Sequence, residues 1–303
     1  MPILMLFFIS ILWSFVAVMI KASSVAVDSF TIAFCRFFFG MFFLGLLLLL
    51  KGGRISLQLK HRWIWIAVIA KSSSYILENT AISMGSVNAS IVELPMQTIF
   101  LVLVSFFYFK EELSKRSLAA TGLCIAGVLL ISWNGLNMTV LFQDSFLVVI
   151  LYILASIGSA YHMASQKVLI QSMDSANMNF SVFFLSSIIT ALPVPLNFEW
   201  KGSFNFPVLL MLVVLGLITG ISFYIYAIAL KKISFLISVI ITNSCILFTL
   251  LWSWLFFNET ITVYIMSGAI LFLSGIFLLN YREKQFSGKS YKVSERTISR
   301  PHG

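Results

Sequence analysis

The feature that most constrains this chain is a succession of long apolar stretches. A helix needs about 20 mainly apolar residues to cross a hydrocarbon core about 30 Å thick, and such stretches recur ten times. Turn-forming pairs, among them Gly52-Gly53 and Asn134-Gly135, separate them. The sequence therefore predicts an all-α integral membrane protein with ten transmembrane helices. The predicted spans are residues 3–22, 29–50, 63–84, 87–109, 117–134, 145–166, 178–196, 207–230, 234–257 and 262–281.

Composition supports lipid as the solvent for most of the chain. Of the 303 residues, 60% are hydrophobic and only 10% are charged, whereas a soluble domain carries about 25% charged residues. The net charge of +9 does not indicate nucleic acid, because the basic residues lie in short loops and the tail without interleaved aromatics. Cys35, Cys124 and Cys245 offer neither metal spacing nor a disulfide framework. We therefore expect no cofactor, no metal and no nucleic-acid partner.

The distribution of Lys and Arg predicts the orientation. With the N-terminus in the cytoplasm, sixteen of the twenty Lys and Arg residues fall in cytoplasmic loops or the tail. Only Lys21 and Lys201 fall on the outer side of the membrane, and Arg36 and Lys71 lie within spans. Such an excess is the positive-inside pattern. We expect both termini to be cytoplasmic, in a cell membrane that is most simply a bacterial inner membrane. No basic residue precedes the first span, so we expect it to be retained rather than cleaved as a signal peptide.

A shift of the sequence by 148 positions reveals an internal repeat. Residues that rarely match by chance coincide in this register without a gap. These matches are Ser86 with Ser234, Glu111 with Glu259 and Gly127 with Gly275. Each half holds five spans, an odd number, so the pattern predicts two inverted repeats, residues 1–134 and 145–281, before a disordered basic tail, residues 282–303. Inverted repeats typically enclose a substrate site near the midplane and work by alternating access.

The repeated segments also carry a recognisable motif. Residues 81–95 read Ala-Ile-Ser-Met-Gly-Ser-Val-Asn-Ala-Ser-Ile-Val-Glu-Leu-Pro, and residues 109–114 read Phe-Lys-Glu-Glu-Leu-Ser. Residues 229–238 and 256–260 repeat this pattern, and residues 34–40 read Phe-Cys-Arg-Phe-Phe-Phe-Gly. Over residues 3–281 the chain resembles the EamA-type branch of the drug/metabolite transporter superfamily. The resemblance implies ten helices, cytoplasmic termini, a central cavity, peripheral helices 5 and 10, and transport of amino acids, metabolites, nucleotide sugars or related solutes.

Four ionisable residues lie deep within the predicted spans, namely Arg36, Lys71, Glu78 and Glu93. Each costs about 2.5–3.5 kcal/mol at mid-helix, so such residues usually face a cavity or one another. The carboxylates also depart from the family pattern, which has uncharged residues there. Lys71, Tyr75 and Glu78 share one helix face, because they are spaced i, i+4, i+7. Two interpretations remain open: the charges bind substrate, or they pair with one another to hold the helices together.

Polar and aromatic residues on other spans are expected to converge on the same cavity. The candidate substrate-binding residues are Trp13, Ser14, Arg36, Lys71, Tyr75, Glu78, Glu93, Gln97, Tyr226 and Asn243. The second half contributes Tyr226 and Asn243, which stands where the first half has Pro95, but no charge. We expect His162 at the membrane interface, and we expect Gly216-x-x-x-Gly220 to mediate packing within the bundle.

These features favour a carrier of small polar or zwitterionic metabolites, above all amino acids or their derivatives. The aromatic content keeps open a nucleotide-bearing substrate, such as S-adenosylmethionine or a nucleotide sugar. A structural or regulatory membrane protein is the alternative class, and it would not need the buried charges. We do not expect an enzyme, because the sequence shows no nucleophile–base pair, metal cluster or phosphate loop. The expected partners are the substrate and the bilayer, for a monomer or homodimer.

Overall fold

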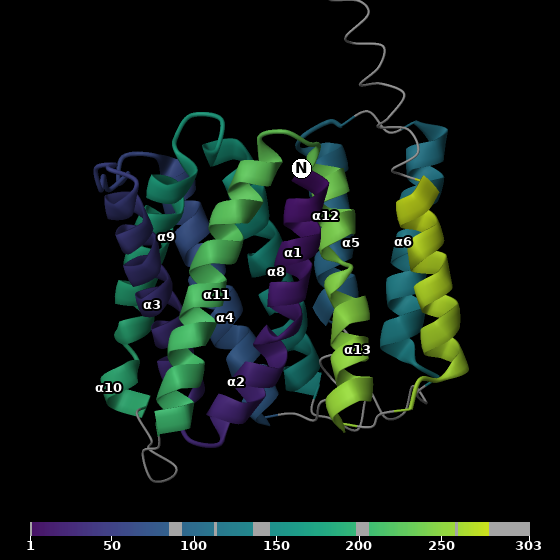
Figure 1. Cartoon of the computed structure of the whole chain (residues 1–303), viewed down its shortest axis with the longest axis horizontal. Coiled ribbons are helices and arrows are strands. Elements are labelled where there is room, and N and C mark those ends of the chain that lie inside the picture. The colour runs from purple at the N-terminus through teal and green to yellow at the C-terminus, as the bar shows by residue number, and fades with distance from the viewer. Residues whose placement is uncertain are drawn as a thin grey trace, which may run out of the picture. The chain divides into compact units, whose positions relative to one another are not determined.

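The computed structural model describes residues 2–84, 93–111, 114–135, 146–197, 206–257 and 260–278, and it is all-helical over these residues (Figure 1). The predicted tail and the pair Asn258-Glu259 lie outside the described residues. The first repeat supplies α1 (Pro2–Ser14), α2 (Val16–Ser24), α3 (Ser29–Leu50), α4 (Arg62–Met84), α5 (Glu93–Phe107) and α6 (Lys115–Trp133). The second supplies α8 (Phe146–Leu169), α9 (Ser175–Ala191), α10 (Val194–Asn197), α11 (Phe206–Leu230), α12 (Phe235–Thr242), α13 (Cys245–Phe257) and a last helix, Val263–Leu278.

Each of the ten predicted spans corresponds to a helix or a pair of helices, which confirms the all-α membrane fold. Among the described residues, seven helical segments are long and apolar enough to cross a membrane, and α5 and Val263–Leu278 are shorter apolar helices. The remaining span, α4, is long but less apolar. It carries Lys71 and Glu78 as well as the buried Ser72, Ser74 and Asn79. Polar side chains of this kind lie in a membrane helix where the protein interior, rather than lipid, covers them.

Three predicted spans are broken rather than continuous, which the sequence analysis did not predict. The first breaks after Ser14, whose hydroxyl donates to the Ile11 carbonyl at 2.6 Å. The ninth breaks beside Ser244, whose hydroxyl donates to the Ile241 carbonyl at 2.5 Å. Such side-chain bonds compete with the backbone ladder and favour a break. The seventh span ends α9 just before Pro193, since proline cannot donate to that ladder.

Four of the helices begin at capping residues that the sequence supplies. Asp28 accepts from the amides of Phe30 and Thr31 at the start of α3, and Asp174 caps α9 in the same way. Ser114 and Ser234 cap α6 and α12. A side-chain oxygen at these positions satisfies N–H groups that have no partner within the helix.

The chain divides into two compact units, and the first contains most of the helices of both repeats. It comprises Met1–Glu111 and Gly135–Ile261. Its core is built from buried apolar side chains of α1, α3, α4, α8, α9, α11 and α12. In α11, a Cβ atom on Gly220 would lie 2.8 Å from the Gly40 carbonyl oxygen of α3, and Gly216 also lies against α3. The predicted packing role of these two glycines is confirmed.

One end of this unit is rich in basic residues, and we call it the lysine-rich end. It holds the chain start, the segment 51–61 between α3 and α4, the end of α5, and the turns that follow α8 and α11 (Figure 1, top). Its basic residues in these turns and segments include Lys51, Lys60, Lys110 and Lys231. The sequence predicts that this end is cytoplasmic.

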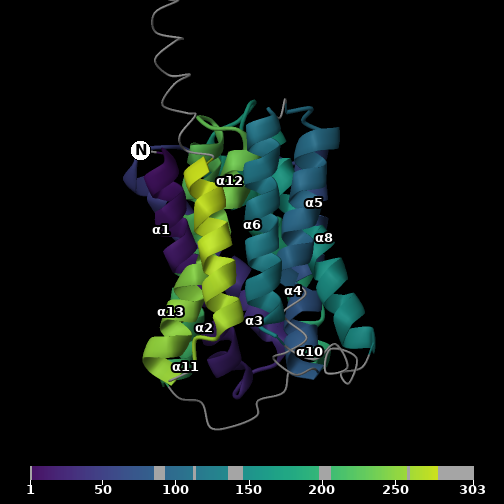
Figure 2. The same cartoon turned by 90° about the vertical axis from the view of Figure 1, so that its right-hand side faces the viewer.

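The second unit comprises Glu112–Asn134 and Thr262–Gly303. Its described part pairs α6 with the helix Val263–Leu278, which lie side by side in Figure 2. Glycines allow the close approach: a Cβ on Gly127 would lie 2.7 Å from the Gly268 carbonyl oxygen, and one on Gly275 would lie 2.7 Å from the Ala120 carbonyl oxygen. These two contacts are repeat counterparts, because Gly275 follows Gly127, and Gly268 follows Ala120, by 148 positions.

Candidate functional site

Lys71 lies buried in the first unit between two aromatic rings. Its Nζ is 4.1 Å from the centroid of the Tyr75 ring and 4.5 Å from that of Phe223. An ammonium over a ring face is attracted by the ring quadrupole. Phe223 follows Tyr75 by 148 positions, so the two rings are repeat counterparts. The ammonium of Lys71 therefore contacts equivalent positions of both repeats, which is the place where inverted repeats typically hold a substrate.

Arg36 of α3 lies against the same tyrosine. Its Cζ is 3.5 Å from the Tyr75 ring centroid, and its Nη1 is 3.9 Å from Glu78 Oε2. The side chain is buried, yet Nε and Nη1 have no hydrogen-bond partner among the described residues. Buried polar groups are nearly always hydrogen-bonded. An edge of guanidinium donors left open in this way is suited to a carboxylate or a similar planar anion.

The two carboxylates that were predicted for the site accompany these cations. Glu78 is on the same face of α4 as Lys71, and Glu93 is the first residue of α5. The charges of Arg36, Glu78 and Glu93 all act on Lys71. Ser156 of α8 donates to the Glu93 carbonyl at 2.9 Å, which fixes the start of α5 against the second repeat. The structure thus brings the four predicted charges together, and their formal sum is zero.

Aromatic residues of α1 and α11 extend the site beyond Phe223. The Trp13 ring centroid lies 5.3 Å from that of Phe223 and 5.9 Å from that of Tyr226. Trp13 Nε1 donates to Ser222 Oγ at 2.8 Å, and the Tyr226 hydroxyl shares a 3.2 Å hydrogen bond with Ser238. These contacts form an aromatic wall, to which Trp13 contributes from the first repeat and Phe223 and Tyr226 contribute from the second.

Three other predicted residues make their hydrogen bonds away from the charged side chains. Ser14 Oγ accepts from Trp252 Nε1 at 2.8 Å. Gln97 Nε2 lies 3.3 Å from Met163 Sδ. Asn243 Nδ2 donates to Thr98 Oγ1 at 2.9 Å, so this asparagine links the break between α12 and α13 to α5. These residues connect helices of the two repeats around the charged cluster.

Beside this cluster lies a polar group that the sequence did not indicate, centred on His162, for which only a position at the membrane interface was expected. His162 is fully buried. Its neighbour Tyr161, which is 52% exposed, lies on the outward face of α8 instead. The His162 ring packs edge-on against Phe223, and its Nε2 lies 3.1 Å from Gln166 Nε2. Gln166 in turn donates to Asn179 at 2.9 Å. The i, i+4 spacing of His162 and Gln166 was the signal that placed both on the inner face of α8.

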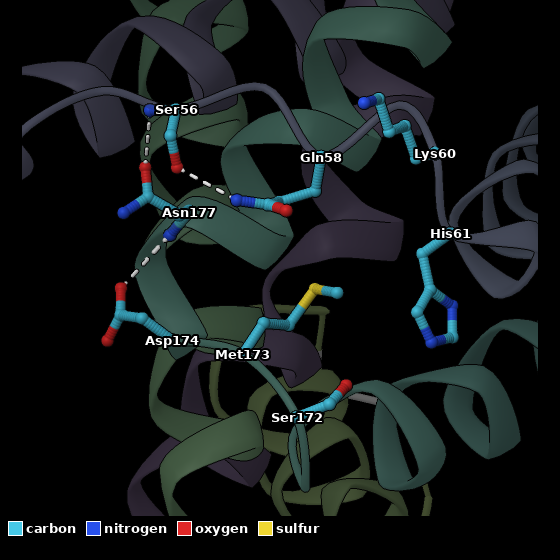
Figure 3. A pocket seen from close by; sticks show the side chains of 8 residues that line it. All are labelled: Ser56, Gln58, Lys60, His61, Ser172, Met173, Asp174 and Asn177. Atoms are coloured by element: carbon cyan, nitrogen blue, oxygen red, sulfur yellow. Dashed lines mark hydrogen bonds between the residues drawn. The ribbon is translucent and has the colours of Figure 1, made fainter.

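A separate open cavity of about 460 Å³ lies at the lysine-rich end (Figure 3). It is lined by Ser56, Gln58, Lys60, His61, Ser172, Met173, Asp174 and Asn177. The segment 51–61 reaches α9 here, because the Ser56 amide donates to Asn177 Oδ1 at 2.9 Å and the Gln58 amide donates to Ser181 Oγ at 3.0 Å. None of the charged cluster lines this cavity. It belongs to the contact between a loop of the first repeat and a helix of the second.

The two-fold pattern of these contacts matches a comparison of the sequence with known families. The model of the EamA-like transporter family matches residues 1–133 and again residues 146–281. The chain belongs to the EamA-like transporter family. As an EamA-like protein it is a multi-pass membrane transporter of small molecules, in agreement with its apolar helices.

Solved structures share the EamA-like fold of this chain, and 28 of their chains match it. One is a crystal structure of another protein, with a TM-score of 0.76 and 16% sequence identity, over 93% of this chain and 97% of that chain. At this identity the match shows the fold alone. No curated protein matches the chain.

Proposed function

We propose that this EamA-like protein is a carrier of zwitterionic metabolites, most simply amino acids or their derivatives, and that it works by alternating access. The observation that carries the proposal is the position of Lys71 between Tyr75 and Phe223, two residues related by the repeat. A substrate that is charged at both ends would find both signs of charge in one buried cluster, at the junction of the two repeats.

The open donors of Arg36 support the assignment of the anionic end of the substrate. Its Nε and Nη1 are buried without a hydrogen bond among the described residues, while Glu78 stands at 3.9 Å from Nη1. A substrate carboxylate would supply the missing acceptors and share them with Lys71. The cationic end would then face Glu78 or Glu93, and the body of the substrate would face the aromatic wall of Trp13 and Tyr226.

Purified protein in proteoliposomes tests this proposal by counterflow with a defined mixture of labelled amino acids and amino-acid derivatives. We expect uptake of at least one of them into protein-containing vesicles, and a loss of about 10- to 100-fold in Glu78→Gln, Glu93→Gln or Lys71→Met, since a charged hydrogen bond contributes about 1.5–3 kcal/mol. Lys51→Met is the matched control, because Lys51 is exposed at the lysine-rich end. If all three variants insert normally and transport at the wild-type rate, the three charges have a structural role and the proposal is wrong.

A nucleotide-bearing metabolite is the second candidate, and the aromatic wall favours it. The Trp13 ring centroid lies within 6 Å of those of Phe223 and Tyr226, and aromatic rings of this kind stack on bases. The same vesicles loaded with S-adenosylmethionine or a nucleotide sugar distinguish the candidates. Uptake of these without uptake of any amino acid replaces the first proposal by the second.

A further inference from the structure

Glu111, which lies just beyond α5, makes three hydrogen bonds through its carboxylate. Oε1 accepts from the Phe235 amide at 2.6 Å, and Oε2 accepts from the Leu236 amide at 2.9 Å and from Ser105 Oγ at 2.7 Å. The two amides are the first of α12. Because the first N–H groups of a helix lack partners within it, a carboxylate here supplies strong, charge-assisted bonds.

These bonds join the two repeats. Glu111 belongs to the first family match and α12 to the second. Beside them, the ring of Phe109 packs against that of Phe235, with 4.9 Å between centroids. The structure gives Glu111 a contact that reaches 124 positions along the chain, into the opposite repeat.

The backbone is bent to allow this contact. Lys110 has a φ of 49°, in the left-handed region, which non-glycine residues seldom adopt. Strained residues of this kind persist where the surroundings determine the conformation, and they cluster at switch regions. The side chains on either side of Lys110, Phe109 and Glu111, both contact α12, which accounts for the bend.

A lysine holds the same turn from its other side. Lys167 of α8 donates through Nζ to the carbonyls of Leu230 and Ile233, each at 2.9 Å. The charges of Lys167 and Glu111 act on each other. The turn between α11 and α12 is therefore held by a cation on its carbonyls, from its own repeat, and by an anion on its amides, from the other repeat.

The geometry points to Glu111 as the latch that keeps the lysine-rich end closed. Alternating access requires the repeats to separate at one end while they close at the other. Opening at this end separates α12 from the end of α5, so the Glu111 carboxylate leaves the amides of Phe235 and Leu236. The inference rests on the alternating access proposed above, but not on the identity of the substrate.

Helix α12 connects the latch to the candidate site. Ser238, one turn along α12, shares a hydrogen bond of 3.2 Å with the Tyr226 hydroxyl, and Tyr226 packs against Trp13. Release of α12 would thus loosen the aromatic wall as well as the closed end. Glu111 is a positioning residue in this scheme, because it acts through α12.

Side-specific thiol labelling tests the latch without a substrate. Cys35, Cys124 and Cys245 are replaced by alanine, and Ser238→Cys places a near-isosteric thiol at a position that is fully buried. A small, charged, membrane-impermeant methanethiosulfonate reagent is then added to either face of proteoliposomes. In separate samples, the variant Lys60→Cys is labelled at an exposed position, and the face from which it reacts shows which face of the proteoliposomes carries the lysine-rich end.

We expect Glu111→Gln to raise the labelling rate from the lysine-rich end about tenfold, which corresponds to about 1.4 kcal/mol, and to lower the rate from the opposite face. Asp174→Asn is the matched control. It neutralises another carboxylate that caps a helix at this end, but one whose cap lies within its own repeat. The control should leave both rates unchanged.

A general loosening would raise both rates together, and that result overturns the latch. Unchanged rates in Glu111→Gln overturn it as well. Should Glu111→Gln fail to give folded protein, Ser105→Ala replaces it, since this variant removes one of the three bonds and keeps the carboxylate. It should raise the rate from the lysine-rich end by a few-fold, and the absence of any one-sided rise there would again reject the proposal.

Discussion

The two repeats share a scaffold but differ in charge at their centre. Where the first repeat has Lys71 and Glu78, the second has Thr219 and Tyr226 at the positions 148 residues later. Arg36 and Glu93 likewise correspond to the uncharged Phe184 and Ile241. At these four positions, the two repeats thus have the same place in the fold but different side-chain chemistry. The first repeat therefore carries the charged side chains of the candidate site, whereas the second has uncharged residues at the same positions.

The two helices of the second unit show the opposite behaviour. Between α6 and the helix Val263–Leu278, the contact of Gly127 with Gly268 is repeated by that of Gly275 with Ala120. Small residues at such positions let helix backbones approach closely. The repeat is therefore kept in this helix pair and lost among the charged side chains around Lys71. Each of the following predictions tests one side of this contrast.

The largest effect is expected from removing the positive partner in the first repeat. Arg36→Met leaves the partly buried Glu78, whose side chain is 18% exposed, without its ion pair. Breaking a fully buried pair costs about 3–5 kcal/mol, so we expect a loss of at most about that size. The double variant Arg36→Met/Glu78→Gln should recover most of the loss. Thermal unfolding in detergent, followed by size-exclusion chromatography, measures both. Equal midpoints for the single and double variants would show that Glu78 has another partner.

Moving the central lysine to the other repeat sharpens the comparison. Lys71→Thr should reduce transport of the identified substrate about 10- to 100-fold, as expected for a lost charged hydrogen bond. Adding Thr219→Lys should restore part of that activity, because the contact of Thr219 with Tyr75 is the repeat counterpart of the contact of Lys71 with Phe223. Counterflow rates are compared with those of Thr219→Ser. If the double variant transports no faster than Lys71→Thr, the two repeats are not equivalent at this position.

In the two helices of the second unit, counterpart substitutions should behave alike. Gly127→Ala and Gly275→Ala each place a methyl group within 3 Å of the facing backbone, and overpacking of this kind costs about 1–3 kcal/mol. We expect their unfolding midpoints to fall by similar amounts. Gly122→Ala is the control, because nothing lies within 4 Å of its Cβ position, and alanine favours a helix over glycine by up to about 1 kcal/mol. Clearly unequal falls in the unfolding midpoints of the Gly127 and Gly275 variants would show that the two contacts are not equivalent.

The smallest effect is expected at the aromatic wall. Trp13→Phe removes the 2.8 Å hydrogen bond to Ser222 but keeps a ring beside Phe223. Hydrogen bonds between membrane helices contribute about 0.6 kcal/mol on average, so stability should fall only slightly. Substrate affinity, measured by competition in the counterflow assay, should fall more than stability does. A reversed order would assign Trp13 to helix packing alone.

Much of the fold was predictable because hydrophobic length and charge position report directly on membrane spans. The ten spans and the packing role of Gly216 and Gly220 follow from such local patterns. The breaks beside Ser14 and Ser244 were not predictable, since serine occurs in many unbroken helices and only its bond to a carbonyl three residues earlier favours the break.

The candidate site was predictable in part. The i, i+4, i+7 spacing of Lys71, Tyr75 and Glu78 placed them on one face, but the approach of Arg36 to the Tyr75 ring depends on how α3 packs against α4. The buried position of His162 depended likewise on which face of α8 meets Phe223. Contacts between helices distant in the chain leave no local pattern, and the bonds from Glu111 to α12 belong to the same class.

The pairing of α6 with the helix Val263–Leu278 also implies a delay between the synthesis of the two partner helices. When α6 ends at Trp133, the ribosome has not yet made its partner, which begins at Val263. At about 5–20 residues per second, the intervening chain takes roughly 7–25 s to emerge. During that interval the glycine face of α6 is without its partner and must be covered by lipid or by an insertion factor. A stop codon before the last helix would therefore leave the early helices inserted but this face permanently uncovered, which marks the nascent chain for quality control.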